Sequence, residues 1–202
     1  MEWNLEHENL LSNITENMII RLAEEKDIQD IINLQGINTY ERLTESEKKN
    51  GFVTTPFTSE QLERLIFERG LFVLEIEAKI QGYTMAASWD YFSQWPIFPV
   101  MLSKMSGNTF EGITISSHNT FQYGPICIDA CLRGTNAFPC LFEKMRKEFS
   151  SRYSVGLTFI NTINKRSNHA HTRKLDLIVM DEFEFSGREY YGLAFNTERS
   201  VL

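Results

Sequence analysis

One feature limits the possible folds of this chain more than any other. It is a strand-like segment that a short loop joins to a strongly amphipathic helix. Residues 123–129 place Ile126 and Ile128 on one side, which predicts a strand. After the loop, large apolar residues recur at helical spacing: Phe138, Leu141, Phe142, Met145 and Phe149. A helix with one apolar face has to bury it, so a strand that runs directly into such a helix predicts a helix packed on a sheet.

Elements on both sides of this joint extend the alternation of strands and helices. Asp27 is expected to cap one helix, and Thr58 and Gln61 form a capping box for a second helix that ends near Gly70. The pair Ser186-Gly187 favours a tight turn and predicts a closing hairpin. The expected strands are 18–22, two within 71–88 divided by a turn near Ala78-Lys79, 123–129, 155–163 and the hairpin 178–195, with a helix at 167–175 and a partial helix within 39–56.

The predicted organisation is a single domain over residues 18–202, preceded by an N-terminal extension over 1–17. Residues 89–121 are rich in aromatic side chains and contain Pro96, Pro99 and Gly107. This composition predicts a long, partly helical insertion that leaves the core of the domain.

Composition excludes several classes of function. The chain has 202 residues, of which 42% are hydrophobic, and this suffices for an ordinary core. A net charge of −7 argues against a general nucleic-acid binder. The acidic N-terminal sequence lacks the basic region of a signal peptide, and the longest apolar patch, 95–102, is too short to span a membrane. Cys127, Cys131 and Cys140 lack metal-type pairing, so free thiols and a cytoplasmic location are expected.

Two motifs carry a resemblance to a known family. The stretch "ICIDACLRGTNAF" follows a predicted strand and contains Asp129 and the pair Arg133-Gly134. The downstream stretch "INKRS" precedes the last predicted helix. With the order of elements, these motifs resemble the GNAT superfamily of N-acetyltransferases, in which a strand ends in V-D-P-x-x-R-G-x-G-x-G and an N-x-R-S segment follows. The resemblance covers roughly 18–196 and implies an α/β fold whose mixed, mainly antiparallel sheet of six to seven strands is flanked by helices.

The resemblance also implies a site for acetyl-CoA, the cosubstrate of the family. A helix N-terminus suits the pyrophosphate anion because its N–H groups are unpaired and its dipole end is positive. Gly134 permits the turn, Asn136 stands for a family glycine in a left-handed conformation, and Phe138 is expected to point into the core. A plain strand-to-helix joint is the alternative. The implied cosubstrate residues are Ile126, Cys127, Ile128, Arg133, Gly134, Thr135, Asn136, Ala137, Phe138 and Asn164.

The role of the basic side chains near this loop stays open. They either attract phosphate or form a solvated helix face, as most such charge runs do. The residues concerned are Arg133, Lys144, Arg146 and Lys147.

For the transfer step, the resemblance implies a proton donor on the last helix, where the family often has a tyrosine. The aligned position is His171, or Thr172 if the register differs by one residue. Histidine donates protons near neutral pH, whereas a structural hydrogen bond is the alternative role. His169 lies two residues away on another side of the helix, so no metal site is expected.

Two functions follow from these observations. The first is an N-acetyltransferase that moves an acetyl group from acetyl-CoA to a primary amine of a small molecule or a protein by direct attack in a ternary complex. The second is a non-catalytic ligand-binding or sensing module of the same fold, which the altered loop favours. Three roles stay open for the aromatic side chains of the insertion. They either line an acceptor pocket, form a small core or make a homodimer contact.

Overall fold

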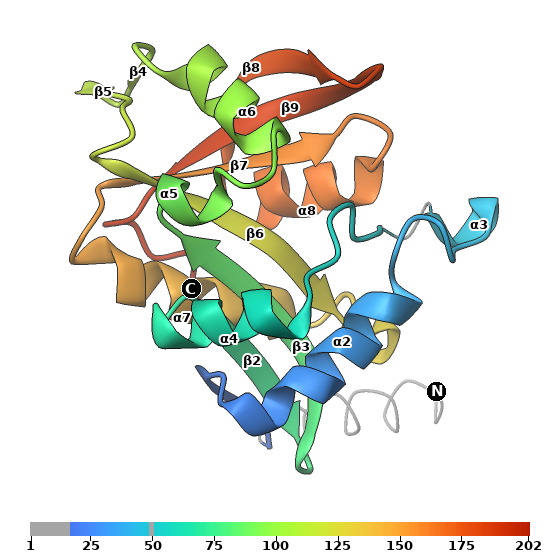
Figure 1. Ribbon diagram of the computed structural model, residues 1–202. Coiled ribbons are helices and arrows are strands. Elements are labelled where there is room, and N and C mark those ends of the chain that lie inside the picture. Colours follow the sequence, from blue (N-terminus) through green and yellow to red (C-terminus); the bar gives the residue numbers. More distant parts are fainter. Residues whose placement is uncertain (1–16, 49–50) are drawn as a thin grey trace, which may run out of the picture.

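The structure is a computed structural model that describes residues 17–48 and 51–202. A seven-stranded sheet in the order β1-β2-β3-β6-β7-β9-β8 forms its centre (Figure 1). Only β6 and β7 are parallel neighbours in this sheet. The strands are β1 (Ile19–Leu22), β2 (Leu71–Ile76), β3 (Lys79–Ala87), β6 (Thr120–Ile128), β7 (Val155–Asn161), β8 (Ile178–Phe185) and β9 (Arg188–Asn196). The expected mixed, mainly antiparallel sheet is therefore confirmed. Except for residue 17, the expected extension lies outside the described residues.

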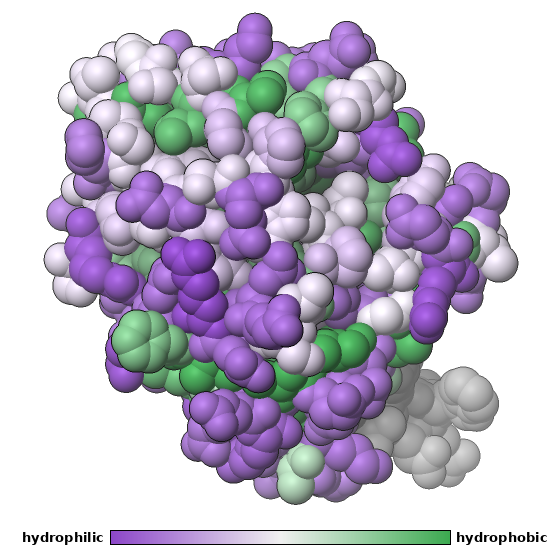
Figure 2. Space-filling view, viewed as in Figure 1, coloured by the Kyte–Doolittle hydropathy of each residue, from purple (hydrophilic) through white to green (hydrophobic). Residues whose placement is uncertain are grey.

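Helices cover both faces of the sheet, and each face has its own apolar core. In Figure 1, α2, α4, α5 and α6 lie on the near face, and α7 packs behind the sheet. Figure 2 shows a band of apolar surface where α2 and α4 meet, and Ile32 and Ile66 of these helices pack on the core. The helices are α2 (Ile28–Ile37), α3 (Glu45–Lys48), α4 (Ser59–Phe67), α5 (Trp89–Phe92), α6 (Ile97–Met105), α7 (Ala137–Ser150) and α8 (Lys165–Lys174), with short 3₁₀ helices η1 (Glu25–Asp27) and η2 (Ala130–Leu132).

The aromatic insertion is part of the core of the near face. It contains α5, α6 and a small hairpin of β4 (Thr109–Phe110) and β5 (Ile113–Thr114). The indole N–H of Trp89 donates to Thr120 Oγ1 at 3.0 Å, and the hydroxyl of Tyr91 donates to the Gln61 carbonyl at 2.8 Å. Tyr91 and Phe92 are fully buried. Of the three alternatives for these aromatic residues, the core is the one that the packing supports.

Local expectations at the helix and strand ends are mostly confirmed. Thr58 and Gln61 form the reciprocal capping box at the start of α4. The β8–β9 turn has positive φ at Ser186 and Gly187 (51° and 71°), as a two-residue hairpin turn requires. Asp27 is an exception, because its carboxylate accepts from the Glu24 N–H at 2.8 Å and from Arg21, and its side chain does not cap α2.

Gly156 of β7 provides a test of the packing on the far face. A Cβ atom at this position would lie 2.0 Å from Cζ of Phe195. Gly156→Ala is therefore expected to lower the free energy of unfolding by about 1–3 kcal/mol in urea denaturation. Gly36→Ala is the control, because its Cβ would meet nothing closer than 3.7 Å and alanine favours the interior of α2. Equal stability of Gly156→Ala and the parent chain would contradict this packing.

None of the helices in the described part of the chain combines the length and the apolar character that crossing a bilayer requires.

Candidate functional site

The two parallel strands at the centre of the sheet separate part-way along their length. β6 pairs with β7 only from Thr120 to Gln122, opposite Val155 to Leu157. The remaining part of β6, up to Ile128, keeps β3 as its partner on the other side. A gap therefore opens between β6 and β7 in the middle of the sheet, where backbone groups are usually paired.

The gap presents backbone groups of two strand residues. The N–H of Asp129 donates to Gln81 on the β3 side at 2.8 Å. Because successive residues of a strand point their backbone groups to opposite sides, those of Ile126 and Ile128 face the gap. The Ile128 carbonyl accepts from Arg133 Nε at 3.1 Å on this side. The pairing of β3 with β6 is irregular opposite Met85, which marks a bulge in β6 just before Ile126. Such a bulge changes the direction of the strand.

A cavity of about 290 Å³ occupies the open end of the gap. Its walls come from the end of β6, the loop before α7, the first turns of α8 and the connection between α2 and α4. Its lining includes Ile126, Cys127, Ile128, Arg133, Gly134, Phe138, Asn164 and His171 from the sequence-predicted set. Thr135, Asn136 and Ala137 of that set do not line it.

The loop before α7 has one of its two expected turn conformations. Gly134 has φ of 97°, and a Cβ atom there would meet nothing within 4 Å. Asn136 is right-handed at φ −77°, so the expected left-handed conformation is wrong; Asn136 already takes the helical conformation that leads into α7. Thr135 Oγ1 accepts from the N–H of Ala137 at 3.1 Å. The N–H groups of Gly134 and Phe138 have no acceptor among the residues that the structure describes.

Phe138 packs on the core of the far face, so the expectation for its side chain is confirmed in part. It is half-buried, lines the cavity and makes an edge contact with the His171 ring at a centroid distance of 5.1 Å. The next residue, Pro139, is buried at the start of the helix, where its missing N–H is tolerated. The Phe138 ring, at a position where the family pattern has glycine, therefore forms part of the cavity wall.

The basic residues near the loop fit neither expectation as a group. Arg133 donates to Asn38 Oδ1 at 2.7 Å and thus ties the loop to the end of α2. Arg146 is buried and bonds Glu143, whereas Lys144 and Lys147 are exposed. Within the cavity the cations are instead Arg133, Arg166 and Lys174.

Asn164 begins α8 and is buried beside the cavity. Its side chain oxygen accepts from the Ser167 N–H at 3.2 Å, which caps the helix. The cap fixes the direction in which α8 leaves β7, and it places the first two turns of α8 along the gap.

His171 is buried and lies in the wall of the cavity, whereas Thr172 lines a different cavity. Nδ1 lies 2.8 Å from the Ser167 carbonyl, so it carries the proton, and Nε2 accepts from the Tyr123 hydroxyl at 3.2 Å. Burial lowers the pKa of His171 from its ordinary 6.5 to about 4, although the Ser167 carbonyl acts in the opposite direction. The expectation of a histidine that donates near neutral pH is therefore corrected: the imidazole is neutral there, because burial penalises its charged form. Its part in catalysis stays a prediction.

The buried imidazole makes the stability of the fold depend on pH. Because the folded-state pKa lies below 6.5, the unfolded chain binds the proton first as the pH falls. The neutral imidazole therefore contributes fully to the free energy of unfolding above pH 6.5. This contribution, roughly 3 kcal/mol in total, is lost as the pH falls from about 6.5 to 4. His171→Gln is expected to remove this part of the pH dependence in urea titrations. His118→Gln, at an exposed histidine, is the control and should keep it; equal slopes for both variants would refute the assignment.

The two other ionisable candidates on β6 are also uncharged at neutral pH. Burial raises the pKa of the Cys127 thiol to about 12, and burial raises that of the Tyr123 hydroxyl well above its ordinary value. A thiol with this pKa is a poor nucleophile. All three cysteines are free, as predicted.

Comparison with solved structures identifies the fold as GNAT-like. A protein from Salmonella typhimurium, described as an acetyltransferase and solved with its cofactor acetyl-CoA, is 13% identical, with 90% of this chain and 94% of that chain covered at a TM-score of 0.59. An N-acetyltransferase from Staphylococcus aureus Mu50 is 16% identical (90% and 99% covered, TM-score 0.58), and an acetyltransferase of the GNAT family from Streptococcus pneumoniae is 12% identical (89% and 98%, TM-score 0.58). No family model matches the sequence, and no curated protein does. The predicted resemblance is thus confirmed at the level of the fold.

Sequence reasoning missed the wall that the α2–α4 connection adds to the cavity. Asn38, Gly51, Phe52 and Val53 lie there. The connection folds back on itself, since the Tyr40 N–H donates to the Val53 carbonyl. The rings of Tyr40 and Phe52 also pack together, with their centroids 4.9 Å apart. Nothing in the local sequence marks this, because the contacts are made between segments that have no regular periodicity.

Proposed function

We propose that the chain is an N-acetyltransferase that moves an acetyl group from acetyl-CoA to a primary amine. The observation that carries this proposal is the open edge of β6 in the middle of the sheet, which leads directly to the N-terminus of a fourteen-residue helix, α7. A strand edge suits an extended, amide-containing arm, and a helix N-terminus suits a phosphate group. One ligand that has both parts in this order is CoA.

The residues of the cavity fit this ligand. The backbone groups of Ile126 and Ile128 that face the gap are placed to bind the amides of the pantetheine arm. The N–H groups of Gly134 and Phe138, with the cations Arg166 and Lys174 in the lining, are placed to bind the pyrophosphate. The open space beside Gly134 allows an anion to approach the backbone.

Acetyl-CoA supplies the activated acetyl group, and the chain supplies binding, orientation and proton handling. A backbone N–H on β6 is placed to stabilise the negative charge that develops on the thioester oxygen, because the strand is rigid and its donor already faces the gap. Because Cys127 is a poor nucleophile, the neutral amine would attack the thioester carbon directly. The new N–C bond replaces the C–S bond, and CoA leaves as a thiolate that takes up the proton lost by the amine. His171 enters this step as a neutral imidazole whose Nδ1 proton is held by Ser167.

Calorimetric titration with acetyl-CoA tests the binding part of the proposal, and release of free CoA thiol with a panel of small-molecule and peptide amines tests the transfer. Saturable binding and amine-dependent thiol release are expected. The absence of heat at millimolar acetyl-CoA would overturn the proposal. The acceptor is proposed only as the class of primary amines.

A binding or sensing module without catalysis is the second candidate, and Phe138 favours it. Its ring lines the cavity against His171 at a position where the family pattern has glycine. Acetyl-CoA binding without thiol release for any amine would support this candidate over the first one.

A further inference from the structure

A second cavity of about 390 Å³ lies on the other side of α8. His171 lines the first cavity, whereas its neighbour Thr172 lines the second. Walls come from α7, the end of α8, the small β4–β5 hairpin, the end of β9 and the chain after it. The size lies in the usual range for small-molecule sites.

The cavity has an apolar floor with three aromatic rings. Phe142 and Phe195 are buried and pack on each other at a centroid distance of 4.8 Å. The apolar lining residues are Phe110, Phe142, Leu175, Ile178, Phe195 and Val201. Such a floor suits an aromatic or aliphatic body of modest size.

Charges at the rim leave one carboxylate without a counter-ion. Glu111 accepts from Arg199 at 2.7 Å and from Asn196 Nδ2 at 2.8 Å, so its charge is compensated. Asp176 also lines the cavity and is exposed, and it forms no ion pair within the residues that the structure describes. Two carboxylates against one guanidinium give the cavity a net negative charge, which favours a cationic ligand.

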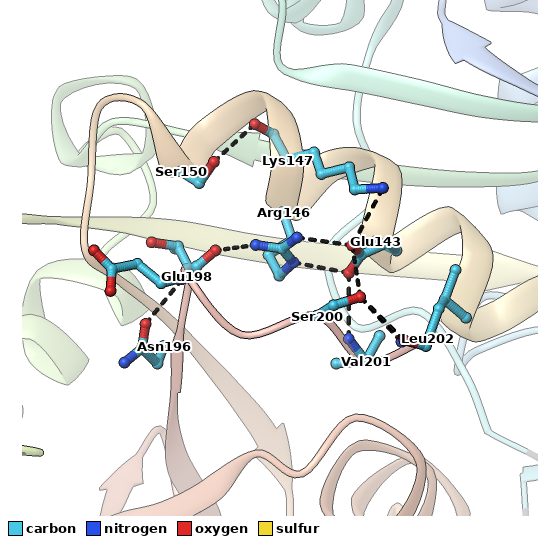
Figure 3. Close-up of polar contacts among 10 residues, drawn as sticks. Glu143, Arg146, Lys147, Ser150, Asn196, Glu198, Ser200, Val201 and Leu202 are labelled. Carbon is cyan, nitrogen blue, oxygen red and sulfur yellow. Dashed lines mark hydrogen bonds and ion pairs between the residues drawn. The ribbon is translucent and has the colours of Figure 1, made fainter.

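The wall formed by the C-terminal segment is held in place by a buried network (Figure 3). Glu143 and Arg146 of α7 form a bidentate ion pair at 2.7 Å. Glu143 also accepts from Ser200 Oγ at 3.0 Å and from the Val201 N–H at 3.4 Å. Ser200 and Val201 line the cavity, so this wall is pre-formed before any ligand binds.

We propose that this cavity is a second ligand site, which takes a small molecule with one ammonium group on an apolar body. The apolar body lies on Phe142 and Phe195, and the ammonium group pairs with Asp176. The site is independent of the proposed acetyl transfer, because none of its side chains lines the first cavity.

Methyl NMR with labelled Ile, Leu and Val tests the site, because each cavity has its own reporters. Phenethylamine is the probe, with 2-phenylethanol and phenylacetate as neutral and anionic controls. Saturable shifts are expected at Leu175, Ile178 and Val201, with Kd on the order of 1 mM, which is usual for a ligand of this size. Ile126 and Ile128 in the first cavity are expected to stay unshifted. Because Asp176 is exposed, the alcohol is expected to bind about 2- to 5-fold more weakly, and the carboxylate more weakly still.

Asp176→Asn identifies the ammonium partner. Asp176 has φ of 54°, and asparagine accepts this conformation, so the backbone should be kept. The variant is expected to bind phenethylamine about 2- to 5-fold more weakly, whereas Asp30→Asn, at an exposed site on α2, should leave binding unchanged. No saturable shift, shifts confined to Ile126 and Ile128, equal binding of the alcohol, or unchanged binding by Asp176→Asn would each overturn the proposal.

Discussion

Replacing Arg146 by methionine is expected to lower the free energy of unfolding by about 3–5 kcal/mol. Arg146 and Glu143 are both buried, with 6% and 3% of their surface exposed. Burial by itself would raise the pKa of Glu143, but bonds from Arg146, Ser200 and Val201 outweigh it and lower that pKa to about 2. Without the guanidinium, an ionised carboxylate stays in the interior with most of its compensation lost, and the Thr197 carbonyl loses its donor.

Urea denaturation at neutral pH measures this effect, and the neighbouring lysine offers a matched control. Lys147 lies 3.6 Å from Glu143 but is 68% exposed, so Lys147→Met is expected to change stability by less than about 0.5 kcal/mol. The double variant Glu143→Leu with Arg146→Met should recover much of the loss, because it leaves no unpaired charge. A small effect of Arg146→Met by itself would contradict the buried network of Figure 3.

Replacing Gly134 by glutamate is expected to weaken acetyl-CoA binding by roughly 100-fold or more, about 3 kcal/mol. The new carboxylate would stand at the loop where the pyrophosphate is proposed to bind, and the two anions repel each other. The left-handed conformation of Gly134, at φ 97°, also becomes strained with any side chain. Calorimetric titration with acetyl-CoA measures the change.

Gly187→Glu is the control for a glutamate placed at a positive-φ glycine outside the proposed site. Gly187 also has a positive φ, 71°, and open space around it, but it lies in the β8–β9 turn outside the cavity. The same charge is introduced there, again at a residue with positive φ, so unchanged affinity is expected. If Gly134→Glu binds acetyl-CoA as the parent chain does while it stays folded, the loop has no part in the site.

The amphipathic helix is the clearest case of what local sequence predicts. Phe142, Met145 and Phe149 repeat at helical spacing and are all buried on the far face of the sheet. Periodicity succeeds because one residue pattern decides both the helix and its buried side. Turn residues were predicted for the same reason: Ser186-Gly187 needs only its own backbone conformation.

The candidate site was predicted in part. The strand and the loop before α7 reach the cavity, since strand order and motif position place them there. Asn136 was predicted wrongly, because its backbone already has the conformation of the helix that follows. Phe138 was predicted in part: it packs on the core but also lines the cavity, because the direction of a side chain at a loop end depends on what packs against it. For Phe138 that neighbour is His171, which lies on another helix.

What the sequence by itself determined is the order of strands and helices, the amphipathic faces and the glycine turns, because each depends on residues close together in the chain. Only the tertiary structure decided which charges are buried and which groups meet. Arg146 belongs to a basic run but is buried by the chain after β9. His171 loses its charge because it is buried where α8 meets Tyr123 of β6 and Phe138 of α7. Burial and pKa depend on neighbours distant in sequence, and no local pattern encodes them.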